Sequence, residues 1–280
     1  MPHCMIVLPA RLASTRLPEK LLKVAAGKTI LQHTYEAACC SRLTDQVVVA
    51  VDNEKLSNEV ENFGGRWVKT STECQSGTDR VAEVASRFPD VELFVNVQAD
   101  EPEIKRETID RVVQSLMDCP EADIATAGTP ITDENTIHDP SSVKIVLGGI
   151  TQKENSTDSN SGLDLESGLR SEALSKQVMQ GRAVYFSRAA IPYVRDGIQS
   201  EDFHRSPPIF WHHIGIYAYR RDFLTWFANA ESSSLEQVEK LEQLRAIEAG
   251  KWIQVVEVDH RAAGIDTQKD FDQFVARISG

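Results

Sequence analysis

The sequence of 280 residues has the proportions of a globular protein, with 41% hydrophobic and 26% charged residues, and its formal net charge is −12 at pH 7. A chain of this length can bury a large core. The negative charge argues against general binding to nucleic acid or acidic membranes, and any local cluster of cations therefore stands out.

Cysteine usage and hydropathy indicate the cytoplasm. The five cysteines are an odd number without a Cys-x-x-Cys pair, which is typical of free thiols in a reducing compartment. The first apolar run begins at Met5, too early for a signal peptide, and no apolar run is long enough to cross a bilayer. We expect a cytoplasmic protein with no membrane partner and no nucleic-acid partner.

Strands and helices alternate along the first half of the chain. Short apolar runs predict strands at 5–10, 46–51, 66–69, 92–97 and 124–127. Apolar residues at helical spacing predict helices at 29–40, 54–63 and 107–117, and one that is capped by Ser76 or Thr78 and runs to 85. This alternation is typical of βαβ units and a mainly parallel sheet.

The pattern changes in the second half of the chain. Residues 143–147 predict a strand, and 148–180 are so polar that they indicate a solvated, partly disordered insertion. Strands follow at 183–187, 214–219 and 252–258, with helices at 236–249 and 267–278.

The loop after the first predicted strand carries Arg11, Arg16 and Lys20 within residues 9–22. Ligands of open α/β sheets bind beyond the carboxyl ends of the strands. Arginine forks and lysine point charges both hold phosphate oxygens. We favour a phosphate site over the alternative of a solvated basic loop.

Two turns from distant parts of the chain carry carboxylates. Gln98, Asp100 and Glu101 follow the predicted strand 92–97, and Asp266 precedes the last predicted helix. Mg²⁺ prefers one or two carboxylates plus substrate oxygens, so the two turns together predict a divalent-ion site. The alternatives are a plain surface turn at 98–102 and a helix cap at Asp266 or Thr267.

Three further patterns carry less information. Residues 75–80 open a helix whose N-terminus suits a phosphate or a base edge, with plain capping as the alternative. Gly27-Lys28-Thr29 imitates the end of a P-loop, but Leu22 stands where the motif needs a glycine. His212 and His213 have no second metal ligand at a suitable spacing, and neighbouring strand residues face opposite sides.

The predicted helix 236–249 carries an acidic face formed by Glu236, Glu239 and Glu242. Such a face is normally solvated. Gln243 and Arg245 beside it leave open a polar site for a hydroxyl-rich ligand.

Seven motifs occur in order from end to end. They are Pro9-Ala-Arg-Leu-Ala-Ser-Thr-Arg-Leu-Pro-Glu-Lys-Leu-Leu22, Gln75-Ser-Gly-Thr-Asp-Arg80, Asn96-Val-Gln-Ala-Asp-Glu-Pro102, Tyr185-Phe-Ser-Arg188 with Ile191-Pro192, His213-Ile-Gly-Ile-Tyr-Ala-Tyr219, Leu241-Glu-Gln-Leu-Arg245 and Gly264-Ile-Asp-Thr267. Together they resemble the 3-deoxy-manno-octulosonate (KDO) cytidylyltransferases, the CMP-KDO synthetases of lipopolysaccharide biosynthesis. CMP-sialate synthetases resemble this family in fold, but their first loop usually carries a different pattern and the run at 75–80 has no counterpart there.

The resemblance implies a Rossmann-like nucleotidyltransferase fold of the glycosyltransferase-A type, a three-layer α/β/α sandwich with a mainly parallel sheet. One domain would span 1–280, with a smaller sugar-binding and dimerisation region inserted at 128–220 that contains the polar insertion 148–180. The implied reaction transfers CMP from CTP to KDO and releases pyrophosphate, with Mg²⁺ as cofactor and a homodimer as the assembly. The anomeric hydroxyl of the sugar attacks the α-phosphorus, so catalysis is positioning plus charge neutralisation.

The resemblance also assigns roles to individual residues. The catalytic group is Arg11, Arg16, Lys20 and Asp100, and the metal ligands are Asp100 and Asp266. The nucleotide-binding group is Pro9, Ala10, Arg11, Arg16, Lys20, Gln75, Ser76, Gly77, Arg80 and Gln98. The sugar-binding group is Gln98, Arg188, His213, Tyr217, Glu242 and Gln243, with Arg188 as the candidate for the sugar carboxylate.

The chain departs from the family pattern at a few positions. Ala99 stands where glycine is usual, Glu19 adds a negative charge to the phosphate loop, and Gln268 replaces a usual proline. Two alternatives therefore stay open. One is a cytidylyltransferase for another sugar acid, either sialate-like or an amino-substituted KDO. The other is an inactive nucleotide-binding homologue, which only Ala99 and Glu19 support.

Overall fold

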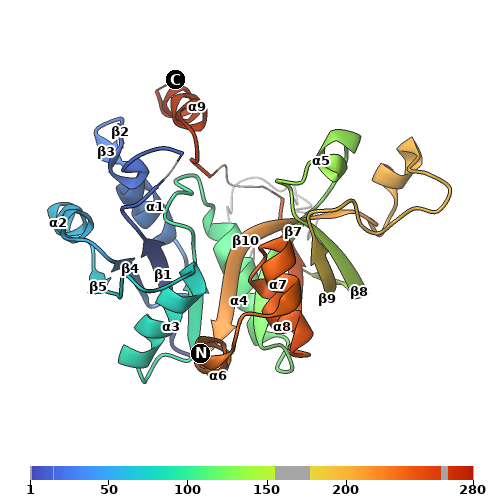
Figure 1. Cartoon of the computed structure of the whole chain (residues 1–280), viewed down its shortest axis with the longest axis horizontal. Helices are drawn as coiled ribbons and strands as arrows, with labels where there is room; N and C mark the ends of the chain where they lie inside the picture. The colour runs from blue at the N-terminus through green and yellow to red at the C-terminus, as the bar shows by residue number, and fades with distance from the viewer. Residues whose placement is uncertain (1, 15, 155–176, 260–263, 280) are drawn as a thin grey trace, which may run out of the picture.

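The computed structural model describes residues 2–14, 16–154, 177–259 and 264–279. One mixed sheet crosses the molecule (Figure 1). The order of its described strands is β5-β4-β1-β6-β10-β7-β11-β9-β8. Their bounds are β1 Cys4–Ala10, β4 Gln46–Val51, β5 Trp67–Lys69, β6 Leu93–Asn96, β7 Ile124–Pro130, β8 Lys144–Glu154, β9 Gln177–Ser187, β10 Trp211–Arg220 and β11 Ile253–Glu257. A small hairpin, β2 Val24–Ala25 and β3 Lys28–Thr29, stands apart.

The strand directions confirm the mainly parallel sheet. β1 pairs in parallel with β4 and β6, β4 with β5, and β11 with β7. Only β10 and β9 run against the other described strands, because each pairs antiparallel with its neighbours. The chain leaves β1 toward β4 on one side and returns to β6 on the other, so the edge between β1 and β6 is a switch point where such sheets bind ligands.

Helices cover both faces of the sheet. Their bounds are α1 Ile30–Ala38, α2 Glu54–Asn62, α3 Gly77–Arg87, α4 Arg106–Met117, α5 Glu134–His138, α6 Arg221–Asn229, α7 Ser234–Glu239, α8 Gln243–Glu248 and α9 Gln268–Ile278. The core beneath α1, α4 and α9 and the core beneath α3, α6 and α8 are separate clusters. The predicted three-layer α/β/α sandwich is confirmed.

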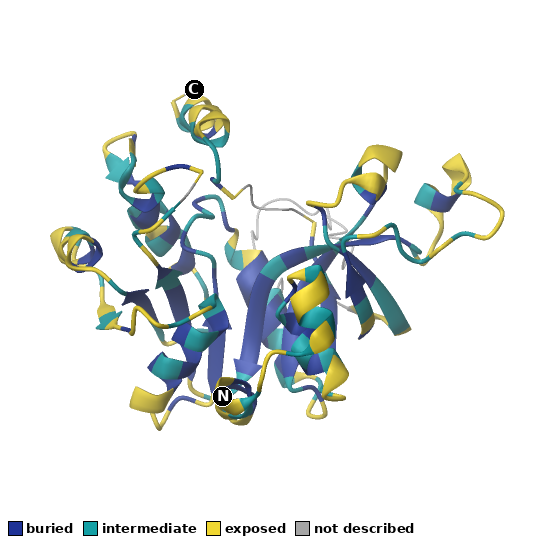
Figure 2. Cartoon of the chain, viewed as in Figure 1, coloured by how far each residue is buried: buried dark blue, intermediate teal, exposed yellow. Residues whose placement is uncertain are grey.

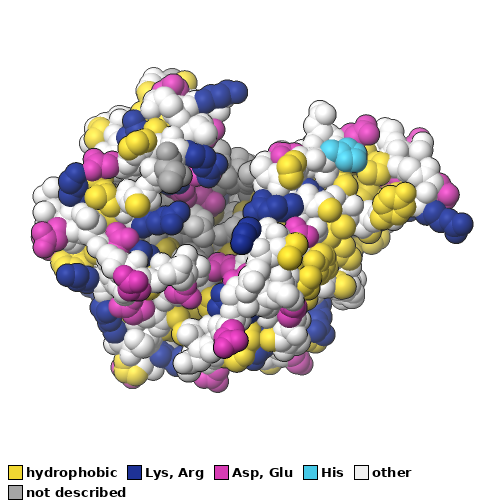
Figure 3. Space-filling view, in the orientation of Figure 1, with side chains coloured by type: hydrophobic (Ala, Val, Ile, Leu, Met, Phe, Trp, Pro, Cys, Tyr) yellow, Lys and Arg dark blue, Asp and Glu magenta, His cyan; other side chains and the backbone are white. Residues whose placement is uncertain are grey.

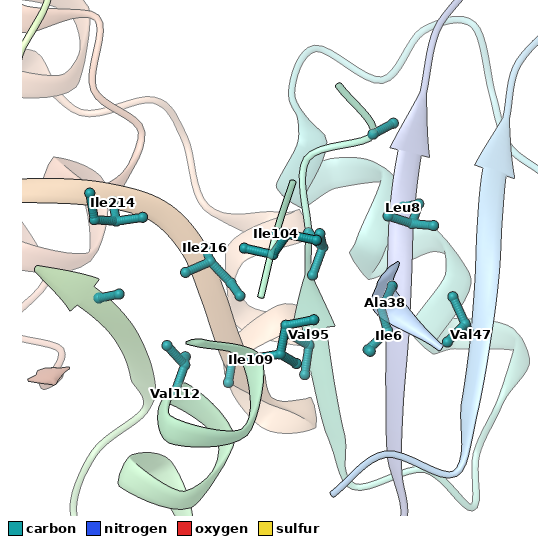
Figure 4. Packing of buried hydrophobic residues seen from close by; sticks show 14 of the residues in the cluster. Ile6, Leu8, Ala38, Val47, Val95, Ile104, Ile109, Val112, Ile214 and Ile216 are labelled. Carbon is teal, nitrogen blue, oxygen red and sulfur yellow. The ribbon is translucent and has the colours of Figure 1, made fainter. Parts of the chain in front are cut away.

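Side chains of β1 alternate between the two cores, as expected for a strand that is buried on both faces. Ile6 and Leu8 belong to the first cluster, and Met5 and Val7 to the second. Figure 2 shows the buried strands in the middle and the exposed outer sides of the helices, and Figure 4 shows the packing of the first cluster around Ile6 and Leu8. This packing fixes the carboxyl ends of the strands on which the candidate site is built.

The prediction of a solvated insertion at 148–180 is wrong at both ends. β8 continues to Glu154 and β9 begins at Gln177, and the two strands pair over most of their length. Glycine in this hairpin permits close approach, because a Cβ at Gly181 would lie 3.1 Å from the backbone oxygen of Gly148. The polar, glycine-rich sequence of these strand ends therefore does not show the usual strand pattern, although both ends are paired in the sheet. Residues 155–176 lie outside the described residues.

The prediction of one helix at 236–249 is also wrong. Lys240 adopts a left-handed conformation with φ 55° and ends α7, and α8 begins at Gln243. The apolar periodicity is misleading, because Val238 is 80% exposed whereas Leu241 and Leu244 are buried. Tertiary contacts of Glu239, described below, override the helical pattern.

All five cysteines are free thiols, as predicted. In the part of the chain that the structure describes, no helix has both the length and the apolar character to span a membrane. The inserted region at 128–220 stays a prediction.

Candidate active site

Two adjoining cavities open at the switch point between β1 and β6. One has a volume of about 240 Å³, and its lining includes Arg11, Arg16, Lys20, Gln98, Asp100 and Asp266. The other has a volume of about 200 Å³, and its lining includes Gln75, Ser76, Gly77 and Arg80. Pro9, Arg11 and Gln98 line both. Figure 3 shows the hollow on this face, with basic side chains gathered along it.

Lys20 lines the first cavity, which we call the cation cavity. It lies in a short 3₁₀ helix, Lys20–Leu22, and its ammonium donates to Asp100 and, at 2.9 Å, to Asp266. Arg16 pairs with the other oxygen of Asp266 at 2.9 Å. Burial lowers the pKa of Lys20, but the Asp100 and Asp266 carboxylates outweigh that effect and raise the pKa above its ordinary value.

The same two carboxylates fit a magnesium ion. Asp100 follows β6 and Asp266 precedes α9, and both reach the Lys20 ammonium, so the fold brings them to one place. The described residues contain no group of three or more His, Cys, Asp or Glu suited to a metal. A pair of carboxylates that leaves the other positions to water and substrate oxygens is the arrangement that Mg²⁺ prefers.

The N-terminus of α3 forms the wall of the second cavity, which we call the helix cavity. Ser76 caps α3, and its side chain and that of Asp79 form a reciprocal capping box. A Cβ at Gly77 would lie 3.3 Å from Asn96 Nδ2 and 3.6 Å from Pro9 Cγ, so glycine lets the helix begin against the end of β1. Plain capping is therefore present, and the cap sits at a cavity.

Arg80 lines the helix cavity, but its guanidinium already has protein partners. It is only 5% exposed. It donates to Thr70 Oγ1 at 2.8 Å and to Asp52 Oδ2 at 2.7 Å. Asp52 Oδ1 in turn accepts from the backbone nitrogen of Leu12 at 3.3 Å. Arg80 thus shapes the cavity and, through Asp52, holds the phosphate loop.

A row of rings on β10 lies beyond Gln98. The ring centroids of His213 and Tyr217 are 5.3 Å apart, and Phe186 of β9 meets His213 edge-on at 5.2 Å. Surrounding protein atoms lower the pKa of His213 to about 3, so this ring is neutral at physiological pH. Burial also raises the pKa of the Tyr217 hydroxyl. Gln98 Nε2 donates to Gly215 O at 3.4 Å, which links the end of β6 to this row.

Glu242 and Gln243 keep buried polar atoms without a partner. Glu242 Oε1 accepts from Thr78 Oγ1 at 2.8 Å, and burial raises the pKa of the Glu242 carboxyl. Among the described atoms, Glu242 Oε2 and Gln243 Nε2 have no hydrogen-bond partner. Unsatisfied buried groups are rare in folded proteins, and here they suit a ligand rich in hydroxyl groups.

Arg188 is half-buried immediately after β9. Its Nε donates to Glu239 O at 2.9 Å and its Nη1 to Pro140 O at 3.0 Å. Of the predicted sugar-binding residues, only Gln98 lines the two cavities described above. The two cavities thus bring together the predicted phosphate, metal and nucleotide residues except Ala10, which is fully buried in the first core cluster. The predicted sugar residues other than Gln98 form a neighbouring group.

Comparison with known proteins decides the family. The model of the cytidylyltransferase family matches residues 5–253. A 3-deoxy-manno-octulosonate cytidylyltransferase of Rhodopirellula baltica is 51% identical over 98% of each chain, and one of Geobacter sulfurreducens is 39% identical over 97% of this chain and 98% of its own. The solved structure of a CMP:2-keto-3-deoxy-manno-octonic acid synthetase complexed with CTP superposes with a TM-score of 0.81 at 32% identity, covering 99% of this chain and 98% of that one.

The chain belongs to the 3-deoxy-manno-octulosonate cytidylyltransferase family. It is therefore a nucleotidyltransferase with the Rossmann-like fold of that family.

The departures from the family pattern leave the site groups in place. Ala99 is 3% exposed in the core, and the described non-glycine residues with positive φ are Glu19, Ala26 and Lys240. Ala99 thus needs no glycine-like backbone. The Glu19 carboxylate pairs with Lys55 at 2.5 Å. Gln268 is the first residue of α9, a position that favours proline but whose N–H is not needed by the helix, so glutamine fits there as well.

Asp52 is the residue that the sequence analysis missed. It directly follows the predicted strand 46–51, and the carboxyl end of a strand is where ligand sites form in this type of sheet. Its two hydrogen bonds, to Leu12 and Arg80, join segments that no local pattern connects.

Proposed function

We propose that this chain transfers CMP from CTP to KDO and releases pyrophosphate, as a step of lipopolysaccharide biosynthesis. The observation that carries the proposal is the convergence of Lys20, Asp100 and Asp266 beside the helix cavity. The names of the relatives and the CTP complex of the related structure support the choice of donor and acceptor.

The two cavities would divide the nucleotide between them. The cation cavity offers Arg11, Arg16 and Lys20 to the triphosphate, and arginine and lysine neutralise the charge of the departing pyrophosphate. The helix cavity, with Ser76 and Gly77 at its rim, would take the cytidine end.

Asp100 and Asp266 would hold Mg²⁺. The ion, when bound, supplies charge neutralisation for the triphosphate and acidifies the attacking hydroxyl. The Lys20 ammonium bonds to both carboxylates and offsets their mutual repulsion. With a cation held by the two carboxylates, Lys20 would be free to bond to the phosphates.

The acceptor would lie between Gln98 and the group formed by Arg188, His213, Tyr217, Glu242 and Gln243. The unpartnered Glu242 Oε2 and Gln243 Nε2 suit sugar hydroxyls, and the neutral His213 ring suits a hydrogen bond rather than an ion pair. The anomeric hydroxyl is itself the nucleophile, so the protein contributes orientation and charge.

We further propose that the enzyme works as a cytoplasmic homodimer. Two large apolar side chains in the region 128–220 are strongly exposed, Val184 at 55% and Tyr193 at 86%. A partner subunit that covered them would remove apolar surface from water.

Competition between sugar acids tests the proposed acceptor. The protein is given CTP, Mg²⁺ and equal amounts of KDO, an amino-substituted KDO and N-acetylneuraminate, and mass spectrometry identifies the CMP-sugars that form. We expect CMP-KDO to be the main product. A main product from another acid would contradict the acceptor assignment, and the absence of any CMP-sugar would contradict the proposed reaction.

A further inference from the structure

We propose that Glu239 is a positioning residue of the acceptor site, which fixes Arg188 and joins β9 to the segment that carries Glu242 and Gln243. This inference rests on the function proposed above. Glu239 belongs to the acidic face of Glu236, Glu239 and Glu242, for which both a solvated surface and a polar ligand site were open interpretations. In the structure its carboxylate bonds to Ser187 and Arg188.

Glu239 makes three hydrogen bonds to the end of β9. Its carboxylate accepts from Ser187 Oγ at 2.6 Å and from the backbone nitrogen of Arg188 at 2.9 Å. Its backbone oxygen accepts from Arg188 Nε at 2.9 Å. One residue therefore binds both the backbone and the guanidinium of Arg188.

Lys144 completes the hold on Arg188 from the other side. Its side chain is fully buried in β8, and its ammonium donates to Arg188 O at 2.6 Å and to Asp139 O at 2.9 Å. A buried ammonium held by carbonyl oxygens is costly. This buried ammonium lies at the end of β9, where it fixes the backbone oxygen of Arg188.

These contacts leave one end of the guanidinium unused. Nε and Nη1 of Arg188 bond to the carbonyl oxygens of Glu239 and Pro140. Within the described part of the chain, Nη2 makes no hydrogen bond. A guanidinium held in this way presents its free N–H groups in a fixed direction, which is what recognition of a carboxylate requires.

The position of Glu239 in the chain extends its effect to the rest of the acceptor group. It is the last residue of α7, and after the left-handed Lys240 the chain reaches Glu242, which accepts from Thr78 in α3. α7 and α8 lie in front of the sheet beside β9 (Figure 1), and α8 packs on that strand. Glu239 thus connects Arg188, at the end of β9, to the segment that carries Glu242.

A purely structural role for Glu239 makes a different prediction. A residue that only stabilises the fold lowers the melting temperature and leaves the KM values of the folded enzyme alone. A positioning residue raises the KM for KDO and leaves the KM for CTP unchanged, because the nucleotide cavities contain none of its contacts.

The test compares steady-state kinetics of the full-length enzyme and its variants, with melting temperatures as a check on folding. Glu239→Met keeps the bulk of the side chain and removes both carboxylate bonds. We expect the KM for KDO to rise about tenfold, from the loss of one pre-ordered side chain, and the KM for CTP to stay within about twofold. Glu239→Gln keeps an acceptor for Arg188 and a partner for Ser187, so it restores most of the affinity for KDO.

Glu248→Ala is the matched control. Its carboxylate also accepts two hydrogen bonds in this helix pair, from Ser234 Oγ and Leu235 N, both at 3.0 Å, and neither of these bonds involves β9. We expect it to leave the KM for CTP unchanged and to raise the KM for KDO much less than Glu239→Met does. Ser187→Ala removes one Glu239 bond from the other side and gives a smaller rise in the KM for KDO, which keeps the test open if Glu239→Met does not fold.

A double-mutant cycle with Arg188→Ala decides whether Glu239 acts through Arg188. We expect Glu239→Met to add little to the KM for KDO once Arg188 is removed. Fully additive effects, or an unchanged KM for KDO in Glu239→Met, would overturn the inference alone. A wild-type enzyme without KDO-dependent turnover would overturn the proposed function and this inference with it.

Discussion

At the scale of single residues, the centre of the site is an ammonium that stands between two carboxylates. Lys20 bonds to Asp100 and Asp266, and Arg16 bonds to the second oxygen of Asp266. A divalent cation needs the same oxygens, and a triphosphate needs the same cations. Binding of metal and binding of nucleotide should therefore favour each other, because each releases the group that the other requires.

Replacement of Lys20 by methionine should change the two affinities in opposite directions. Without the ammonium, Mn²⁺ alone should bind more tightly because the carboxylates no longer have a competing partner. CTP should bind about tenfold or more weakly, as for the loss of a charge-assisted hydrogen bond. Electron paramagnetic resonance measures free Mn²⁺, and calorimetry measures CTP binding.

Lys28→Met is the control for that variant. It removes the same charge from a partly exposed lysine that pairs with Glu36 and does not line the two cavities. It should leave both affinities as they are. Mn²⁺ binding that is weaker or unchanged in Lys20→Met would contradict the view that Lys20 competes with the metal.

The grouping of site residues could be predicted where they are close in the sequence or lie in turns at the ends of predicted strands. Arg11, Arg16 and Lys20 stand in one loop, and Asp100 and Asp266 stand in turns at strand ends, so their meeting follows from the sheet. Asp52 was missed because its meaning depends on contacts with Leu12 and Arg80 that only the folded chain brings together.

At the scale of elements, two serine caps begin the helices beside the site. One lies at the helix cavity, and the other begins the helix that ends at Glu239. Ser76 begins α3 at the helix cavity, and Ser233 begins α7, which ends at Glu239. Both serines form capping boxes, with Asp79 and Glu236 respectively. The two caps are chemically alike, and in the proposed mechanism they support the binding of different substrates.

Removal of each cap should affect the binding of a different substrate. Ser76→Ala and Ser233→Ala should each cost about 1 kcal/mol of stability, seen as a drop in melting temperature of about 2–4 °C. Ser76→Ala should also weaken CTP binding, whereas Ser233→Ala should raise the KM for KDO and spare CTP. The same substrate profile for both variants would show that the caps act only through global stability.

Element prediction failed where tertiary contacts outweigh local pattern. The helix 236–249 breaks at Lys240 because Glu239 is drawn to Ser187 and Arg188. β8 and β9 extend into polar sequence because their glycines allow close pairing.

α6 is a different case, because its local pattern was present and was overlooked. Phe223, Leu224 and Phe227 repeat at helical spacing and are buried.

At the scale of the whole molecule, an acidic protein concentrates cations at one switch point of its sheet. The net charge of −12 contrasts with the basic lining of the cation cavity. The alternation of strands and helices predicted the layers, and the order of the seven motifs identified the family. The sequence pattern left open how far β8 and β9 extend and how the acceptor group is tied together, since these depend on contacts between distant segments.

The most direct measurement of the central claim is pyrophosphate release with CTP, KDO and Mg²⁺, each omitted in turn, beside the Asp100→Asn variant. We predict release only when all three components are present, and none from Asp100→Asn even though it melts as the wild type does. Release without Mg²⁺ or from Asp100→Asn would contradict the metal site. A complete mixture in which CTP binds but no pyrophosphate appears would contradict the proposed transfer itself.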